Sequence, residues 1–194
     1  MQTELVQALR PVVAFLDHCR ARYFVGGSVA SSYHGASRST LDVDLTAQLN
    51  ESAVTDLCAA LSDNYYLNEQ SIRSAIRRNS CFNLIHFETS FKVDVFVSDA
   101  SPYSDESQKR AIIAELDVDP ILLVRMASVE DIIIIKLDWY RLGGEASERQ
   151  WSDLRTVAML NVKQLDFEYV GKWAQLKGLT SLFERLLKEI HFTS

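Results

Sequence analysis

The chain has 194 residues, of which 47% are hydrophobic and 24% are charged, and its formal net charge is −6. A chain of this length can bury roughly 70% of its unfolded surface, so we expect one globular unit or two small ones. The negative charge argues against a protein held to nucleic acid by a broad basic surface. A local basic patch is one interpretation of Arg73, Arg77 and Arg78, which would share a helix face, but a solvated helix face is the favoured one.

Neither export nor membrane insertion is expected. Cys19, Cys58 and Cys81 have no metal-binding spacing and imply no disulfide framework. The stretch Met1 to Arg22 is charged and lacks the apolar centre of a signal peptide, and the longest apolar run, Ile132 to Ile135, is far too short to cross a bilayer. We therefore expect a cytoplasmic protein with no membrane partner.

The first elements of the chain lead into a glycine turn. Apolar spacing from Leu5 to Leu16 predicts a helix, kinked or divided at Pro11, and Tyr23 to Val25 is a predicted strand. Gly26-Gly27-Ser28 follows, where glycine permits positive φ and Ser28 would cap a helix from Val29 to His34. Helix N-termini bind phosphate through free N–H groups and the helix dipole. Gly26, Gly27 and Ser28 are therefore candidate nucleotide-binding residues.

Two later strands carry acidic residues on one face. In Leu41 to Leu45, Asp42 and Asp44 point away from the apolar side, and Asp94 does the same in Phe91 to Val97. Neighbouring carboxylates repel unless a proton or a cation lies between them. Oxygen ligands without His or Cys favour magnesium, and such acids can bridge two ions about 4 Å apart. We expect Asp42, Asp44 and Asp94 to bind two Mg²⁺ ions.

The remaining pattern predicts an α/β (α+β) fold, with a mixed β-sheet, flanking helices and a helical C-terminal region. Asn50 would cap a helix from Glu51 to Leu61, and Asn83 to Glu88 would form a hairpin with the Asp94 strand across Thr89-Ser90. Ser98 to Gln108 is the candidate boundary, which divides the chain into a core of residues 1–100 and a region of residues 101–194. That region would contain two strands and then four helices, at Ala111 to Leu116, Ile121 to Met126, Ile132 to Arg141, Glu148 to Leu160, Leu165 to Leu176 and Leu182 to Ile190.

The glycine turn and the acids together resemble a known superfamily. Val25-Gly26-Gly27-Ser28-Val29-Ala30, then Arg38-Ser39-Thr40-Leu41-Asp42-Val43-Asp44, then Asp94, resemble the DNA polymerase β-type nucleotidyltransferases. Thirteen residues separate Ser28 from Asp42, at the long end of that family's spacing, and Gly26 stands where the family has a hydrophobic residue. The stretch is similar to the minimal, AbiEii-like (abortive-infection, toxin–antitoxin) branch. That branch also carries a Lys and an Asp on C-terminal helices, which Lys136 and Asp153 match, so the resemblance covers residues 23 to about 155.

The resemblance implies metal-dependent transfer of a nucleoside monophosphate from a nucleoside triphosphate to an acceptor hydroxyl. Asp42 and Asp44 would bind both ions, and Asp94 would bind one and accept the proton of the attacking hydroxyl. Arg38 and Lys136 would neutralise the pyrophosphate, and Asp153 would line the nucleotide site. The acceptor would be tRNA, another RNA, a protein or a small molecule, and the chain would act with a partner toxin or antitoxin.

Simpler interpretations remain open for each feature. The glycines can form a plain turn, Asp42 and Asp44 can line a solvated sheet edge, and Asp94 can form a surface ion pair with Lys92. Lys136 can be a surface lysine, and Asp153 a partner of a nearby arginine. For the whole chain, the rival hypotheses are a non-catalytic, antitoxin-like interaction or regulatory protein with the same fold, and a nucleotide-binding phosphohydrolase.

Overall fold

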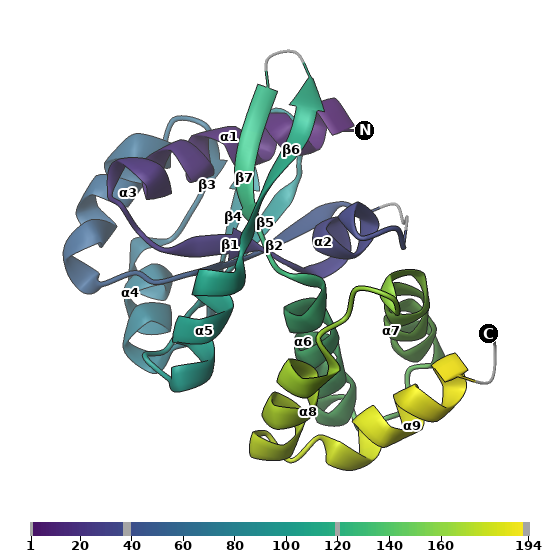
Figure 1. Ribbon diagram of the computed structural model, residues 1–194. Helices are drawn as coiled ribbons and strands as arrows, with labels where there is room; N and C mark the ends of the chain where they lie inside the picture. The colour runs from purple at the N-terminus through teal and green to yellow at the C-terminus, as the bar shows by residue number, and fades with distance from the viewer. Residues whose placement is uncertain (1, 37–39, 119–120, 192–194) are drawn as a thin grey trace. The chain divides into compact units, whose positions relative to one another are not determined.

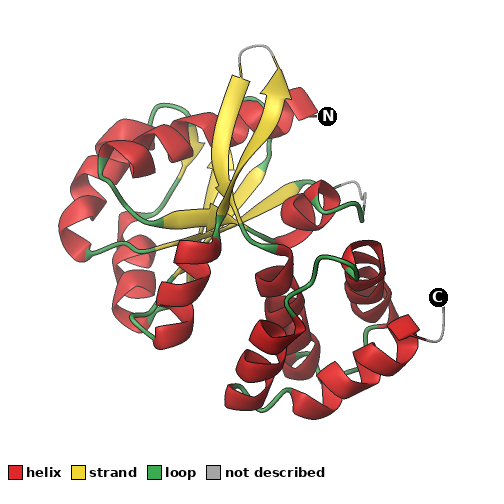
Figure 2. Cartoon of the chain, viewed as in Figure 1, coloured by secondary structure: helices red, strands yellow, loops and turns green. Residues whose placement is uncertain are grey.

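The computed structural model describes residues 2–36, 40–118 and 121–191. Contacts within the chain define two units, residues 1–29 with 39–127 and residues 30–38 with 128–194. The first unit contains the β-sheet, and the second contains the C-terminal helices (Figures 1 and 2).

The sheet of the first unit has the strand order β3-β4-β5-β2-β1-β7-β6. Strand β2 is parallel to β5 and antiparallel to β1, and β1 is parallel to β7. The outer pairs β3 and β4, β4 and β5, and β6 and β7 are antiparallel. The predicted mixed sheet is therefore confirmed. Its strands are β1 (Tyr23–Val25), β2 (Asp42–Ala47), β3 (Tyr65–Tyr66), β4 (Cys81–His86), β5 (Lys92–Val97), β6 (Ile112–Val118) and β7 (Ile121–Met126).

Alternation along the central strands separates an apolar face from a polar one. Val43 and Leu45 of β2 and Val93 and Val95 of β5 are buried. Helix α1 (Gln2–His18) contacts β5, β6, β7 and α3 (Val54–Leu61), and α4 (Glu69–Arg78) contacts β4 and α3. Burial of one aliphatic side chain stabilises a fold by about 1.5–3 kcal/mol. The apolar face therefore gives the sheet enough stability for its other face to carry charges.

Three local predictions need correction. Helix α1 is not divided, because Pro11 lies inside it and the burial of Val12 and Leu16 outweighs one lost backbone hydrogen bond. Strand β2 begins at Asp42, so Leu41 lies outside it and is 74% exposed rather than buried. The predicted hairpin of β4 and β5 is confirmed, but its turn is longer than two residues, with Ser90 at a φ of 57°.

The segment predicted as a boundary contains a helix, α5 (Pro102–Arg110). Ser101 caps it, because the Ser104 N–H donates to the Ser101 hydroxyl oxygen at 3.2 Å, and Pro102 lies in its first turn. Serine and proline at these positions start helices as readily as they form loops. The strands that follow α5, β6 and β7, extend the sheet of the first unit.

The second unit is helical, as predicted. Ser128 caps α6 by accepting a hydrogen bond from the Asp131 N–H at 3.1 Å, and the buried Asp131 carboxylate accepts one from the Tyr169 hydroxyl at 2.8 Å. None of the helices in the described part of the chain has both the length and the apolar character that a membrane span needs. The helices of this unit are α6 (Val129–Leu142), α7 (Glu148–Asn161), α8 (Phe167–Leu176) and α9 (Thr180–His191).

One buried hydrogen bond joins β3 to α1 and can be tested directly. The Tyr65 hydroxyl donates to the Ala8 carbonyl oxygen at 2.7 Å, and Tyr65 is 1% exposed. We expect Tyr65→Phe to lower the free energy of unfolding by about 1 kcal/mol, measured by urea denaturation. The control is Tyr66→Phe, because Tyr66 is 61% exposed, and we expect that change to have almost no effect. Equal effects of the two substitutions would contradict the role of this bond.

Candidate active site

The register between the parallel strands β2 and β5 decides where the acids lie. Asp44 pairs with Asp94, and Asp42 pairs with Lys92. Paired residues of neighbouring strands share a face and are roughly 4.8 Å apart. The carboxylates of Asp44 and Asp94 therefore lie next to each other on the face opposite the buried valines.

Asp94 is held from two sides. Asn83 of β4 pairs with it in the antiparallel register, and the Asn83 side-chain amide donates a short hydrogen bond to Asp94 Oδ1. The Lys92 Nζ lies 2.7 Å from Asp94 Oδ2. The ion pair between Lys92 and Asp94 that the sequence suggested is therefore present. Its acidic partner is largely buried, because the Asp94 side chain is only 12% exposed.

Asp42 has its own hydrogen-bond partner. The Thr40 hydroxyl donates to Asp42 Oδ1 at 2.5 Å and lies 3.0 Å from the Asp42 carbonyl oxygen. Asp42 is half-buried, at the start of β2. This contact fixes the carboxylate on the same face as Asp44.

The glycine turn is built against Asp44. The Gly26 N–H donates to the Asp44 carbonyl oxygen at 2.8 Å. Gly27 has a φ of 55°, and a Cβ at this position would lie 1.7 Å from Asp44 Oδ2 and 2.8 Å from Asp44 Cβ. Only glycine combines this backbone conformation with the space that the carboxylate occupies. The backbone of the turn and an acid of the strand therefore touch directly.

The helix after the turn starts earlier than predicted. Helix α2 spans Gly27–Tyr33, so Ser28 lies in its first turn and does not cap it. Gly27, at the start of this helix, has a left-handed backbone conformation. Ser28 is half-buried beside Gly27.

The donor set can be compared with the needs of a divalent cation. Asp42, Asp44 and Asp94 offer oxygen atoms only, as magnesium prefers, and the Lys92 ammonium already stands at Asp94 as a cation would. Among the described residues, however, no three His, Cys, Asp or Glu side chains are gathered closely enough to hold a metal ion. Asp94 is turned to Lys92 and Asn83, and Asp42 to Thr40. The residues fit magnesium in charge and chemistry, and binding it requires these side chains to turn.

The acid cluster changes the pKa of its neighbours. The pKa of Lys92 is raised, first by its hydrogen bond to Asp94 and then, against the effect of desolvation, by the charges of Asp94, Asp42 and Asp44. Desolvation, together with the charges of Asp94 and Asp44, raises the pKa of the Cys81 thiol to about 11. Cys81 lies on β4 two residues before Asn83, so both side chains point to the polar face.

The other predicted residues have separate surroundings. Arg38 lies outside the described residues. Lys136 of α6 and Asp153 of α7 belong to the second unit, where Lys136 Nζ is 4.0 Å from Asp153 Oδ2 and both side chains are partly buried. Arg73 and Arg77 of α4 form ion pairs with Glu69 and Glu51, so these two arginines are not an open basic patch.

Sequence reasoning missed the role of Asn83 and Thr40. The polar Asn83 between the apolar Phe82 and Leu84 shows that it faces away from the core, but only the strand register shows that it faces Asp94. Thr40 precedes Asp42 by two residues, and this short spacing is the only signal in the sequence for their contact.

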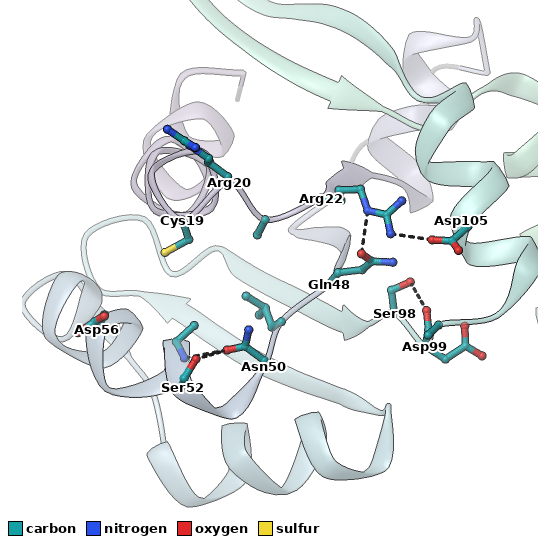
Figure 3. Close-up of a pocket in the computed structure, with 14 residues that line it drawn as sticks. Cys19, Arg20, Arg22, Gln48, Asn50, Ser52, Asp56, Ser98, Asp99 and Asp105 are labelled. Atoms are coloured by element: carbon teal, nitrogen blue, oxygen red, sulfur yellow. Dashed lines mark hydrogen bonds and ion pairs between the residues drawn. The ribbon is translucent and has the colours of Figure 1, made fainter.

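A separate pocket of about 730 Å³ lies at the other end of the same strands (Figure 3). Arg22 precedes β1, Gln48 follows β2 and Ser98 follows β5, whereas the acids lie near the starts of β2 and β5. The Arg22 guanidinium donates to Gln48 Oε1 at 2.9 Å and to Asp105 Oδ1 at 2.6 Å. Both contacts are drawn as dashed lines in Figure 3. This arginine is already neutralised, so the pocket offers a weaker anion site than its composition suggests.

Comparison with known proteins shows the fold. No family model matches the sequence, and no curated protein matches it. Similar solved structures are the antibiotic-resistance factor ANT(2'')-Ia (17% identity, 100% of both chains, TM-score 0.57) and an antigenic nucleotidyltransferase-like protein from Paracoccidioides brasiliensis (16% identity, 96% of this chain and 93% of that one, TM-score 0.55). A third is the lincosamide antibiotic adenylyltransferase LnuA with bound lincomycin (13% identity, 82% and 98%, TM-score 0.50). The chain therefore has the nucleotidyltransferase fold that the resemblance predicted, while the AbiEii-like branch stays a prediction.

The contact between Gly27 and Asp44 predicts a sharp difference between the two glycines. Gly27→Ala places a methyl group on the Asp44 carboxylate in a strained backbone conformation, and we expect it to destabilise the protein by at least about 1 kcal/mol. Gly26→Ala is the matched control, because its nearest neighbour would be 3.9 Å away. Thermal unfolding of both variants tests this. If Gly27→Ala is as stable as Gly26→Ala, the described contact is wrong.

The raised pKa of Cys81 predicts slow alkylation. A pKa near 11 leaves almost no thiolate at pH 8, so we expect iodoacetamide to react slowly with Cys81 and faster as the pH rises towards 11. Asp94→Asn removes one of the charges that raise this pKa and should speed the reaction at pH 8. Peptide mass spectrometry follows Cys81 and, as an internal control, Cys19 in the same sample. Unchanged Cys81 reactivity in the variant would contradict the effect of Asp94.

Proposed function

We propose that this protein is a magnesium-dependent nucleotidyltransferase, which transfers a nucleoside monophosphate from a nucleoside triphosphate to an acceptor hydroxyl. The observation that carries the proposal is the pairing of Asp44 with Asp94 across two parallel strands, with Gly27 packed against Asp44. The nucleotidyltransferase fold supports it. A plain turn beside a solvated sheet edge would not require such a close fit between glycine and acid.

Each residue would have a distinct role. Asp42 and Asp44 would hold both magnesium ions, and Asp94 one of them. Bound magnesium would neutralise the phosphates and lower the pKa of the attacking hydroxyl. The backbone N–H groups at Gly27 and Ser28, at the start of α2, would donate hydrogen bonds to the phosphates.

The chemical step is an in-line displacement. The acceptor oxygen attacks the α-phosphorus, the bond to the oxygen that bridges the α- and β-phosphates breaks, and pyrophosphate leaves with that electron pair. Asp94 is the proposed acceptor for the proton of the attacking hydroxyl. On the superfamily resemblance alone, Arg38 and Lys136 would neutralise the pyrophosphate and Asp153 would line the nucleotide site. Within the second unit, the Asp153 carboxylate lies 4.0 Å from the Lys136 ammonium.

Two classes of acceptor are compatible with the proposal. ANT(2'')-Ia is an antibiotic-resistance factor, and LnuA is an antibiotic adenylyltransferase whose structure contains lincomycin. A hydroxyl group of a small molecule is therefore one candidate acceptor. The AbiEii-like resemblance favours tRNA, another RNA or a protein, in a toxin–antitoxin pair with a partner chain. Transfer to either class needs nucleoside triphosphate, which agrees with the proposed location in the cytoplasm.

One observation favours a non-catalytic alternative. The Lys92 ammonium is bound to the Asp94 carboxylate, and in the described part of the chain no three acids are close enough together to hold a metal ion. A regulatory or antitoxin-like protein that binds nucleotide without transferring it would tolerate this arrangement. Binding of nucleotide without transfer distinguishes this alternative from the enzyme.

The central test is label transfer. The protein is incubated with magnesium and each α-labelled nucleoside triphosphate, in the presence of cell RNA, cell protein and a panel of antibiotics that includes lincosamides. We expect one acceptor class to become labelled by the wild type and not by the Asp42→Ala, Asp44→Ala double variant. Nucleotide binding without labelling of any acceptor would favour the regulatory alternative, and release of free phosphate would favour the phosphohydrolase.

Asp44→Asn separates catalysis from folding. The substitution keeps the shape of the side chain but removes a charge beside Asp94, so we expect an unchanged or higher melting temperature. Transfer should fall by about 100-fold or more, the scale seen when one preorganised electrostatic group is removed from an active site. Asp63→Asn, at an exposed turn, is the control and should leave both unchanged. A sharp fall in the melting temperature of Asp44→Asn, or retained transfer, would contradict the proposed role.

A further inference from the structure

Lys92 is a lysine of the first unit that lies directly beside the acids of the candidate site. It lies on β5, paired in register with Asp42, and its Nζ is 2.7 Å from Asp94 Oδ2. Asp44 is the register partner of Asp94 itself. The ammonium group is therefore bound to Asp94, while Asp42 and Asp44 lie on the same face of the neighbouring strand, where their charges and that of Asp94 repel each other.

The partner of Lys92 is held firmly in place. Asn83 donates to the other oxygen of Asp94, so the carboxylate is fixed from both sides. The Lys92 side chain is 41% exposed, whereas that of Asp94 is 12% exposed. An ion pair between two exposed side chains contributes little, but this pair neutralises a largely buried charge. Because a side chain takes no part in the backbone pairing of β5 with its neighbours, the ammonium of Lys92 can leave Asp94 without a change in the sheet.

The ammonium and a divalent cation compete for the same oxygen atom. Asp94 Oδ2 cannot contact Lys92 at 2.7 Å and at the same time offer its full charge to a metal ion. No three acids are gathered on one point in the part of the chain that the structure describes, and the Asp94 carboxylate is turned towards Lys92.

We propose that Lys92 is a built-in counter-ion of the acid site: its ammonium neutralises Asp94 in the metal-free protein, yields Asp94 Oδ2 to a divalent cation, and so lowers the affinity of the site for that cation. The inference rests on the proposed function, because it assumes that the three acids bind metal. It makes Lys92 a positioning residue, which acts through Asp94. It also gives the chain a way to stabilise an acid site before metal and nucleotide arrive.

Cation affinity tests the inference without any transfer assay. Mn²⁺ and Mg²⁺ are titrated into the full chain without nucleotide, with free Mn²⁺ measured by electron paramagnetic resonance and Mg²⁺ binding by calorimetry. Lys92→Met removes the charge at similar length, and we expect about tenfold tighter binding, the effect of one unit charge about 5 Å from a divalent ion in a water-like dielectric. Lys92→Arg keeps the charge and should bind no more tightly than the wild type.

Lys109→Met is the matched control. Lys109 also forms an ion pair, with Glu106 at 3.6 Å, but on α5 and not on the strands that carry the acids, so its removal should leave cation affinity unchanged. Lys92→Gln is measured in parallel and carries the same expectation if Lys92→Met does not fold. A second readout is the melting temperature, which should fall in metal-free Lys92→Met and recover more in Mg²⁺ than that of the wild type.

The outcomes separate this inference from the proposed function. Equal or weaker cation binding by Lys92→Met and Lys92→Gln overturns the counter-ion role, even if the wild type transfers nucleotide. Tighter binding by both variants supports it, even if no acceptor is ever labelled, and only the transfer proposal then falls. Absence of cation binding by every variant overturns the counter-ion role together with the metal site.

Discussion

The structure of the site depends on one constraint, the register that pairs Asp44 with Asp94 across parallel strands. Two carboxylates at this separation repel each other, so the folded state needs a cation, a proton or hydrogen-bond donors nearby. Lys92 and Asn83 both reach Asp94. The apolar residues on the other face of the same strands hold the register, since a slip of β2 by one residue would turn Val43 outward and Asp42 and Asp44 inward.

The register also determines what the glycine turn must be. Asp44 projects from the polar face, and the chain that leaves β1 passes close to the Asp44 carboxylate. The residue at that point cannot carry a side chain, and it is Gly27, with a left-handed backbone conformation. The hydrogen bond from the Gly26 N–H to the Asp44 carbonyl oxygen fixes the approach. Turn and strand are therefore one structural unit, although thirteen residues separate Ser28 from Asp42.

The features that depend on a local sequence pattern could be predicted from the sequence. Alternation along the chain predicted the strands and the face of Asp42, Asp44 and Asp94, and capping residues such as Ser128 predicted helix starts. It could not predict that Asn83 faces Asp94, because this depends on the pairing of two strands. Helix α5 was missed because its Ser101 and Pro102 are common to loops and to helix N-termini alike. The fit of Gly27 against Asp44 was missed because it joins residues of two separate elements.

An acid site for divalent cations faces a conflict between stability and affinity. Carboxylates arranged ideally for a metal ion repel most strongly when the ion is absent, so the metal-free protein would be least stable where affinity is greatest. A tethered ammonium relieves this repulsion at the expense of cation affinity, and Lys92 is close enough to Asp94 to do so. If the chain binds triphosphate as proposed, the phosphates would add negative charge to the same site and shift the balance back towards the divalent cation. In such an arrangement metal and nucleotide would bind more strongly together than either would alone, and the chain would stay folded before both arrive.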